Sequence, residues 1–175
     1  MVLFFILIYG KNILTNNTGL KIKNQMEGKK IVITSGYFNP LHIGHINLIR
    51  ESKKLGDFLV VLVNNDKQVK LKGSVPFMKE QERLEIVKAL RYADEVILSV
   101  DKDATQAKSL KLIANKYKGD LCFAKGGDRN FDNLPESEKD VCKKFNIKVL
   151  NGVGGDKVQS SSWLLKNTVD KIKQS

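Results

Sequence analysis

Two histidines three residues apart are the side chains of this sequence best placed to handle negative charge. His42 and His45 are the two histidines of the chain, and Gly44 stands between them. Residues at positions i and i+3 share one face of a helix, so a helix that begins here would point both imidazoles the same way. The free backbone N–H groups of a helix start favour an anion, and a glycine leaves room for a phosphate beside the backbone. The spacing predicts a phosphate site at this helix start. Gly36 precedes it and allows a tight turn from strand to helix.

A lysine in a later loop could add a positive charge to the same site. Lys72 lies after the apolar segment 58–63 and just before Gly73, where the chain can turn. A lysine ammonium is a compact point charge, which suits it to neutralising a phosphate group. Lys70 is the nearest alternative in sequence, and we assign it to substrate binding.

A glycine-rich turn follows another apolar segment, residues 121–124. Gly126 and Gly127 would let the backbone approach a base or a ribose, and Asp128 can accept a hydrogen bond from a hydroxyl or amino group. Arg129 comes next and is the candidate for a contact with a phosphate or with the second substrate.

Five short apolar segments must position these residues. They span 31–34, 58–63, 96–98, 121–124 and 147–150, with helical patterns around 46–55, 84–90, 110–117, 135–145 and 160–172. The alternation predicts an α/β fold, a Rossmann-like doubly wound sheet of five parallel strands with helices on both faces. We expect the strand order 3-2-1-4-5, in which the first and fourth strands are neighbours. Ligands bind beyond the carboxyl ends of such strands, so the histidine, lysine and glycine segments would meet at one edge.

Two expectations concern details of the helices. Asp103 is a candidate N-cap for the helix around 110–117. Trp163, Leu164 and Leu165, near the start of the last helix, are expected to pack in the core.

The composition describes one globular domain with a strong positive charge. The chain has 175 residues, and its 30 Lys and Arg against 19 Asp and Glu give a net charge of +11. Such a charge attracts partners that carry phosphate. Basic and acidic residues are interleaved, as in 136–144, and 7% of residues are aromatic, so we expect no binding to nucleic acid. No apolar run reaches the roughly 20 residues that cross a membrane, so no membrane association is expected.

The amino terminus and the cysteines complete this description. Residues 1–28 are predicted to be an amino-terminal extension or linker, because 12–28 are rich in Asn, Lys, Thr and Gly. The apolar run 2–9 has no basic residue before it apart from the chain's own amino group and no cleavage pattern close behind, which argues against a secretory signal. Cys122 and Cys142 lack zinc spacing and are too few for a disulfide framework, so we expect reduced thiols and a cytoplasmic protein.

The segment GYFNPLHIGH, residues 36–45, resembles the HxGH signature of the cytidylyltransferase-like nucleotidyltransferases. The resemblance continues through LKG at 71–73, KGGD at 125–128 and the three serines at 160–162, and covers about residues 30–173. HxGH alone is moderately specific, whereas the ordered set is strongly specific. Within the family the sequence looks most like adenylyltransferases acting on heptose 1-phosphate, and next like glycerol-3-phosphate cytidylyltransferase. Residues 29–175 would then form the nucleotidyltransferase domain.

The resemblance implies a reaction. NMP would pass from ATP or CTP to the phosphate of a small phosphorylated sugar or polyol, and pyrophosphate would be released. His42, His45 and Lys72 would be the catalytic residues, stabilising charge on the phosphates. Mg²⁺ carried by the nucleotide phosphates is the usual partner of a triphosphate, and we expect no metal ligands from the protein. A homodimer is a further expectation.

The resemblance also implies nucleotide contacts from the signature and from the last helix. The nucleotide-binding residues would be Gly36, Tyr37, Phe38, Asn39, Gly44, Gly126, Gly127, Asp128, Ser160, Ser161 and Ser162. Hydroxyl groups and free N–H groups at a helix start suit a triphosphate. Asn39 stands where the signature usually has aspartate, so any charge role of that residue is absent.

Two other functions stay open. An adenylyltransferase of coenzyme synthesis, acting on pantetheine phosphate or a mononucleotide, shares HxGH, although LKG and KGGD speak against it. A nucleotide-binding module without catalysis is the other alternative. The retained His42, His45 and Lys72 favour chemistry, whereas Asn39 keeps the non-catalytic alternative open.

Overall fold

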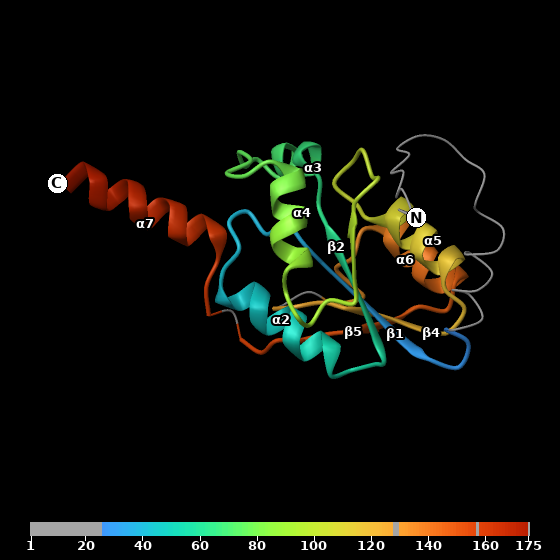
Figure 1. Cartoon of the computed structure of the whole chain (residues 1–175). Helices are drawn as coiled ribbons and strands as arrows, with labels where there is room; N and C mark the ends of the chain where they lie inside the picture. Colours follow the sequence, from blue (N-terminus) through green and yellow to red (C-terminus); the bar gives the residue numbers. More distant parts are fainter. Residues whose placement is uncertain (1–25, 128–129, 157, 175) are drawn as a thin grey trace, which may run out of the picture.

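The central feature of the molecule is a parallel sheet, seen in a computed structural model (Figure 1). The structure describes residues 26–127, 130–156 and 158–174. Segment 1–25 and the predicted site residues Asp128 and Arg129 lie outside the described residues, so their roles stay predictions.

The sheet has the order β3-β2-β1-β4-β5, and every neighbouring pair is parallel. Its strands are β1 (Lys30–Gly36), β2 (Phe58–Val63), β3 (Glu95–Leu98), β4 (Asp120–Ala124) and β5 (Lys148–Leu150). The predicted order 3-2-1-4-5 is therefore confirmed. Because β1 is central, Ile31, Val32 and Ile33 are fully buried between two layers of helices.

Two helices cover each face of the sheet (Figure 1). Alternate residues of a strand point to opposite faces. Val32 packs with α2 (Ile43–Lys53) and α4 (Glu80–Lys88). Ile31 and Ile33 pack with α5 (Ala107–Lys116) and α6 (Glu136–Lys144) on the other side. The doubly wound arrangement is confirmed.

The loop expected after β2 contains a short helix, α3 (Asp66–Leu71). Its N-cap, Asn65, accepts from the backbone of Gln68, and the Gln68 side chain accepts in return from the backbone of Asn65. This reciprocal pair satisfies free N–H groups and starts the helix. Lys72 is the C-cap residue of α3 and so sits at the end of a helix, not inside a loop.

The last helix, α7 (Ser161–Gln174), extends away from the body of the protein (Figure 1). Both faces of the sheet are already covered, so α7 buries none of its residues. Trp163 is 50% exposed, and Leu164 and Leu165 are partly exposed. The expectation that these three residues lie in the core was wrong.

The expected cap of α5 was also wrong. Helix α5 begins at Ala107 after Gln106, and Gln106 makes no side-chain capping bond. Asp103 instead accepts from the backbone N–H of Thr105, at 2.8 Å, within the preceding turn. An aspartate that closes its own turn in this way is unavailable to a helix four residues later.

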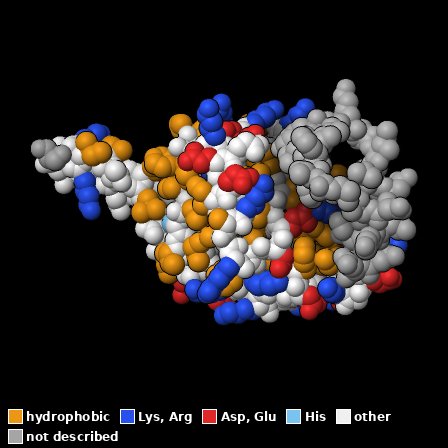
Figure 2. Space-filling view, viewed as in Figure 1, with side chains coloured by type: hydrophobic (Ala, Val, Ile, Leu, Met, Phe, Trp, Pro, Cys, Tyr) orange, Lys and Arg blue, Asp and Glu red, His pale blue; other side chains and the backbone are white. Residues whose placement is uncertain are grey.

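The surface carries mixed charge. Figure 2 shows Lys and Arg side chains interleaved with Asp and Glu over the visible face. Within the described part of the chain, no helix is both long and apolar enough to span a membrane.

Candidate active site

A cavity of about 640 Å³ opens at the carboxyl edge of the sheet. Most of the predicted site residues line it, although they come from distant parts of the sequence. They are Gly36, Tyr37, Asn39, His42, Gly44, His45, Lys72, Gly126, Gly127, Ser160, Ser161 and Ser162. The cavity lies where β1 and β4 are neighbours and the winding direction reverses, as expected for a ligand site in such a sheet.

The two histidines cap the start of α2 through their own ring nitrogens. His42 is the N-cap, and its Nδ1 accepts from the backbone N–H of Gly44 at 3.1 Å. The Nδ1 of His45 accepts from the backbone N–H of His42 at 3.3 Å, and the ring centroids are 3.7 Å apart. A nitrogen that accepts carries no proton, so in each neutral ring the proton is on Nε2. Both rings therefore offer an N–H donor.

Burial keeps these rings neutral. Burial, together with smaller electrostatic effects of His42 and Lys72, lowers the pKa of His45 to about 3. Burial also lowers the pKa of His42. At pH 7 the histidines are thus neutral hydrogen-bond donors, and Lys72 supplies the positive charge beside them.

Phe38 packs against the His45 ring and does not line the cavity. Its side chain is buried, and its ring centroid lies 4.9 Å from that of His45 in an edge-on arrangement. A Cβ on Gly36 would lie 2.8 Å from the Phe38 ring, so glycine is needed there to make room for it. The structure places the Phe38 side chain in the core, outside the lining of the cavity.

Lys72 stands where two cavities meet. A second cavity of about 510 Å³ shares Tyr37, Lys72 and Gln106 with the first. The Nζ of Lys72 lies 4.5 Å from the centroid of the Tyr37 ring, a cation–π distance. Lys70 is exposed on α3 and lines neither cavity, so the structure does not place it at the site.

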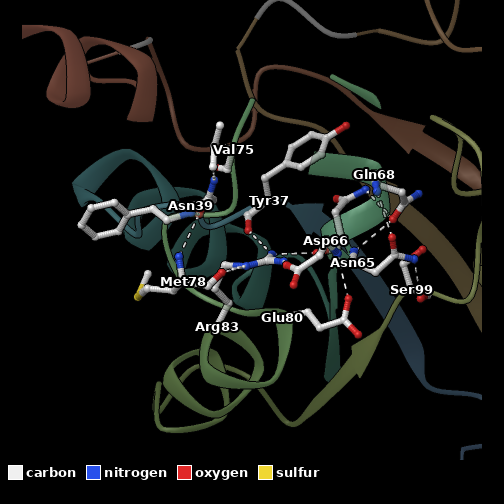
Figure 3. Close-up of polar contacts among 12 residues, drawn as sticks. Tyr37, Asn39, Asn65, Asp66, Gln68, Val75, Met78, Glu80, Arg83 and Ser99 are labelled. Carbon is white, nitrogen blue, oxygen red and sulfur yellow. Dashed lines mark hydrogen bonds and ion pairs between the residues drawn. The ribbon is translucent and has the colours of Figure 1, made fainter. Parts of the chain in front are cut away.

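A buried arginine ties the loops of the site together (Figure 3). The guanidinium of Arg83 donates to the carbonyl oxygens of Tyr37, Asn64 and Met78 at 2.6, 2.7 and 3.1 Å. It also pairs with Asp66 at 2.6 Å. A buried charge is tolerated only when it is paired and hydrogen-bonded in this way. Sequence reasoning gave Arg83 no role, because an arginine among charged residues of a helix resembles a surface residue.

Asn39 holds the segment 75–78 (Figure 3). Its Nδ2 donates to the carbonyl oxygen of Val75 at 2.8 Å, and its Oδ1 accepts from the N–H groups of Phe77 and Met78 at 2.6 and 3.3 Å. An amide both donates and accepts, whereas a carboxylate only accepts. The asparagine that replaces the usual aspartate therefore has a structural task in this chain.

The serines join the start of α7 to the histidine segment. Ser161 Oγ donates to the carbonyl oxygen of Pro40 at 3.0 Å. Ser160 Oγ accepts from the backbone N–H of Trp163 at 3.3 Å and lies 3.1 Å from Ser162 Oγ. All three line the first cavity, so their predicted contact with phosphates is sterically open.

Sequence reasoning missed a second glycine-rich loop after β5. Gly154 and Gly155 line the first cavity. Gly154 has a φ of 92°, and a Cβ there would lie 2.9 Å from the Cα of Leu48 in α2, so only glycine fits. The run GVGG directly after a strand was a usable signal, because loops after strands form the site in this fold.

Three buried polar residues that line the two cavities were given no role by sequence reasoning. They are Gln106, Lys125 and Glu138, all buried. Lys125 belongs to the KGGD motif; its Nζ lies 3.9 Å from Glu138 Oε2 and 4.1 Å from the centroid of the Phe123 ring. No sequence pattern connects these positions, since they come from three separate elements.

The described residues contain no group of three or more His, Cys, Asp or Glu that could hold a metal ion. The two cysteines are buried and unpaired with each other. Burial raises the pKa of Cys142 to about 11 and also raises that of Cys122, so both thiols are protonated.

Comparisons with known proteins agree on one family. The model of the family described as cytidylyltransferase-like matches residues 33–171. FAD synthase of Thermococcus sibiricus is 37% identical over 124 residues, which cover 70% of this chain and 80% of that protein. The bifunctional protein HldE of Shewanella loihica is 30% identical over 149 residues, 84% of this chain but 29% of HldE.

A solved structure shares the fold. It is that of the lipopolysaccharide core biosynthesis protein from Thermoplasma volcanium, with a TM-score of 0.57 and 30% sequence identity. The match covers 71% of this chain and 96% of that one. The chain therefore has relatives in two groups with different names.

Proposed function

Since the chain belongs to the cytidylyltransferase-like family, we propose that it transfers NMP from ATP or CTP to the phosphate of a small phosphorylated sugar or polyol. Pyrophosphate is the second product. The observation that carries this proposal is the placing of two neutral N–H donors and one lysine at the edge of a cavity large enough for a nucleotide.

That arrangement supports the following reaction. A phosphate oxygen of the acceptor attacks the α-phosphorus in line, and the bond from the α-phosphorus to the bridging oxygen breaks. No residue forms a covalent intermediate, so the chain contributes positioning and stabilisation of negative charge. His42 and His45 donate hydrogen bonds to phosphate oxygens on which negative charge grows. Lys72 neutralises negative charge between the phosphates of the NTP and the phosphate of the second substrate. Mg²⁺ enters with the triphosphate as part of the substrate and neutralises part of its charge.

A second acceptor is favoured by the relatives named FAD synthase. FAD is AMP joined through a pyrophosphate bridge to flavin mononucleotide (FMN), so its formation from ATP is the same reaction on another phosphate. The relative from Thermococcus sibiricus is 37% identical and is covered over 80% of its length. The argument from LKG and KGGD against a coenzyme-forming enzyme therefore loses its force, and adenylyl transfer to FMN is the alternative.

The non-catalytic alternative has lost its main support. It depended on Asn39 in place of aspartate, and Asn39 has a structural task in holding Val75, Phe77 and Met78. The relative from Thermococcus sibiricus is an enzyme by name, FAD synthase.

Pyrophosphate release tests the proposal directly. Each of ATP, CTP, GTP and UTP would be supplied with Mg²⁺ and one of heptose 1-phosphate, glycerol 3-phosphate, FMN or pantetheine phosphate. We expect release that depends on both substrates, with ATP or CTP and with a sugar or polyol phosphate. If FMN is the one phosphorylated substrate that supports release, the alternative is established. If no pair of substrates gives release, both the proposed function and the alternative are refuted.

Replacing the histidines tests the mechanism. His42→Ala and His45→Ala should each lower kcat by about 10²–10³, the usual cost of removing one donor to developing charge. Lys111→Ala, on the exposed side of α5, is the control and should keep full activity. A folded double variant with near wild-type turnover would remove the histidines from the mechanism.

We also propose a homodimer located in the cytoplasm. Several large apolar side chains are strongly exposed, among them Val75, Phe77 and Val158, and such exposure is typical of interaction surfaces. Light scattering after gel filtration should give twice the chain mass of 19.7 kDa. A monomer at micromolar concentration would refute the dimer, and cell fractionation tests the location.

A further inference from the structure

The second cavity shares Tyr37, Lys72 and Gln106 with the first, and the nucleotide contacts described above do not account for the rest of its lining. We propose that this cavity binds the acceptor and recognises hydroxyl groups on the carbon chain next to the acceptor's phosphate, through Glu138 and Gln106. The inference rests on the proposed function and names a chemical feature of its second substrate.

The junction between the cavities determines where the acceptor must lie. In-line attack requires the acceptor oxygen about 3–3.5 Å from the α-phosphorus. The nucleotide side of the junction is lined by the histidines and serines, and Lys72 lines both cavities. An acceptor phosphate placed against Lys72 therefore directs the rest of the molecule away from the nucleotide, into the second cavity. Its volume of about 510 Å³ is enough for a small phosphorylated sugar.

A buried carboxylate lines that cavity. Glu138 is 4% exposed, and its Oε1 accepts from the backbone N–H of Gln106 at 2.9 Å. Its Oε2 lies 3.9 Å from Lys125 Nζ, so the charge is held in place by a buried partner. A carboxylate only accepts hydrogen bonds. A cavity wall of this kind favours ligand groups that donate, and hydroxyl groups are the donors that a sugar or polyol carries.

A second hydrogen-bond acceptor, the side-chain oxygen of Gln106, lies where the two cavities share their lining. The Gln106 side chain is 5% exposed, and its Nε2 donates to Asn64 Oδ1 at 3.3 Å. Its Oε1 is buried and, among the described residues, has no hydrogen-bond partner. A buried acceptor without a donor is unfavourable, and a donor supplied by a ligand removes that cost. Because Gln106 lines both cavities, the ligand group in question lies close to the reacting phosphate.

The hydrogen-bond acceptors on Glu138 and Gln106 point to a feature that the candidate second substrates share. Heptose 1-phosphate, glycerol 3-phosphate and the ribityl chain of FMN all carry hydroxyl groups within a few carbons of the phosphate. A simple alkyl phosphate carries none. The second cavity would therefore accept the first three to different degrees and reject the last.

Steady-state kinetics with two variants tests this. Glu138→Gln keeps the shape of the side chain and removes its charge, and Gln106→Met removes the acceptor at the junction. The control is Glu136→Gln, on the same helix α6 but 70% exposed and outside both cavities. We expect each of the first two variants to raise the KM for the best hydroxylated acceptor about tenfold, with the KM for the nucleotide changed less than about twofold. The control should change neither value.

The wild-type enzyme provides a measurement that does not depend on variants folding. The kcat/KM for glycerol 3-phosphate should exceed that for propyl phosphate by about tenfold or more. Heptose 1-phosphate and FMN, measured beside them, identify which hydroxylated compound is preferred. Equal values for glycerol and propyl phosphate, or variants that change only the nucleotide KM, would overturn the inference. If no acceptor supports pyrophosphate release, the proposed function fails and the inference falls with it.

Discussion

At the scale of single residues, the site divides its work between neutral donors and one cation. The backbone N–H groups of Gly44 and His42 occupy the Nδ1 atoms of the two histidines, which leaves Nε2–H groups for a ligand. Neutral donors do not attract a triphosphate over distance, but they cost no desolvation of charge when the nucleotide binds. Lys72 and the overall charge of +11 supply the attraction.

The low pKa of His45 predicts a pH dependence of stability. The ring resists protonation in the folded chain down to about pH 3, whereas in the unfolded chain it takes up a proton below about pH 6.5. The unfolded state therefore binds more protons in this window, and the free energy of unfolding falls as the pH falls. Between pH 6.5 and 5 the loss should reach up to about 2 kcal/mol.

The variant His45→Asn should remove the part of this dependence that His45 causes and leave the part due to His42, whose pKa burial also lowers. An asparagine Oδ1 can still accept from the backbone and does not titrate. Urea unfolding at pH 7, 6 and 5 gives the slopes. A variant whose slope between pH 7 and 5 equals that of the wild type would show that His45 does not cause the loss.

Lys72 should affect catalysis and not folding. It is exposed, so Lys72→Ala should change the free energy of unfolding by no more than about 0.5 kcal/mol. The same change should lower kcat/KM strongly, because it removes the positive charge at the junction of the two cavities. Lys111→Ala is the matched exposed control. Lys53 would be a poor one, since its Nζ contacts Asp94 at 2.6 Å. Equal kinetics for the Lys72 and Lys111 variants would assign Lys72 to the surface.

At the scale of elements, the site depends on loops that are fixed by side chains buried beneath them. Arg83 from α4 reaches the ends of β1 and β2, and Asn39 from the loop after β1 reaches back to the segment before α4. Arg83 therefore links α4 to the loop after β1, and Asn39 links that same loop to the segment before α4 (Figure 3). The loops that carry Tyr37 and the segment 75–78 are therefore held without help from a ligand.

The variant Asn39→Asp should weaken this connection. A carboxylate keeps the bonds from Phe77 and Met78 but would face the carbonyl oxygen of Val75 with no proton to share. We expect the free energy of unfolding to fall by about 1–3 kcal/mol, measured with urea at pH 7. Asn47→Asp is the control, because its Oδ1 accepts from Arg50 at 3.0 Å and a carboxylate would keep that bond. Equal stability of the two variants would mean that the Val75 contact contributes nothing.

At the scale of the whole molecule, the sequence predicted the sheet because strand and helix alternate with a clear period. The order 3-2-1-4-5 was expected because it is a doubly wound order that places the first and fourth strands side by side, where ligands bind in such sheets. The histidines and GG turn could be predicted to converge for the same reason. Arg83, Gln106 and Glu138 could not, because a buried polar residue is recognisable only from the partners that surround it in space. For helix α7 the error was the opposite: its apolar residues were predicted to be buried, but the sheet has no free face for them to pack against.

The boundary of the folded domain gives the last prediction, on the role of residues 1–25. Every described strand and helix lies after Met26, and Met26 itself packs against the core cluster beneath α5 and α6. Its carbonyl oxygen accepts from the backbone N–H of Lys29 at 3.2 Å, just before β1 begins. A shortened chain that starts at Met26 should therefore keep the Tm and the turnover of the full chain.

A second chain that starts at Ile31 is the matched comparison. It lacks Met26 and also Lys30, whose backbone N–H donates to Asp57 at 2.8 Å and whose carbonyl oxygen accepts from the N–H of Asp57, also at 2.8 Å. We expect this chain to unfold at a clearly lower temperature, because it loses both the first bonds of the central strand and an apolar contact of the core. If the chain from Met26 were destabilised as much as the chain from Ile31, residues 1–25 would belong to the folded domain. If it stayed folded but lost turnover, those residues would instead contribute to the site, and the comparison of Tm with kcat separates the two outcomes.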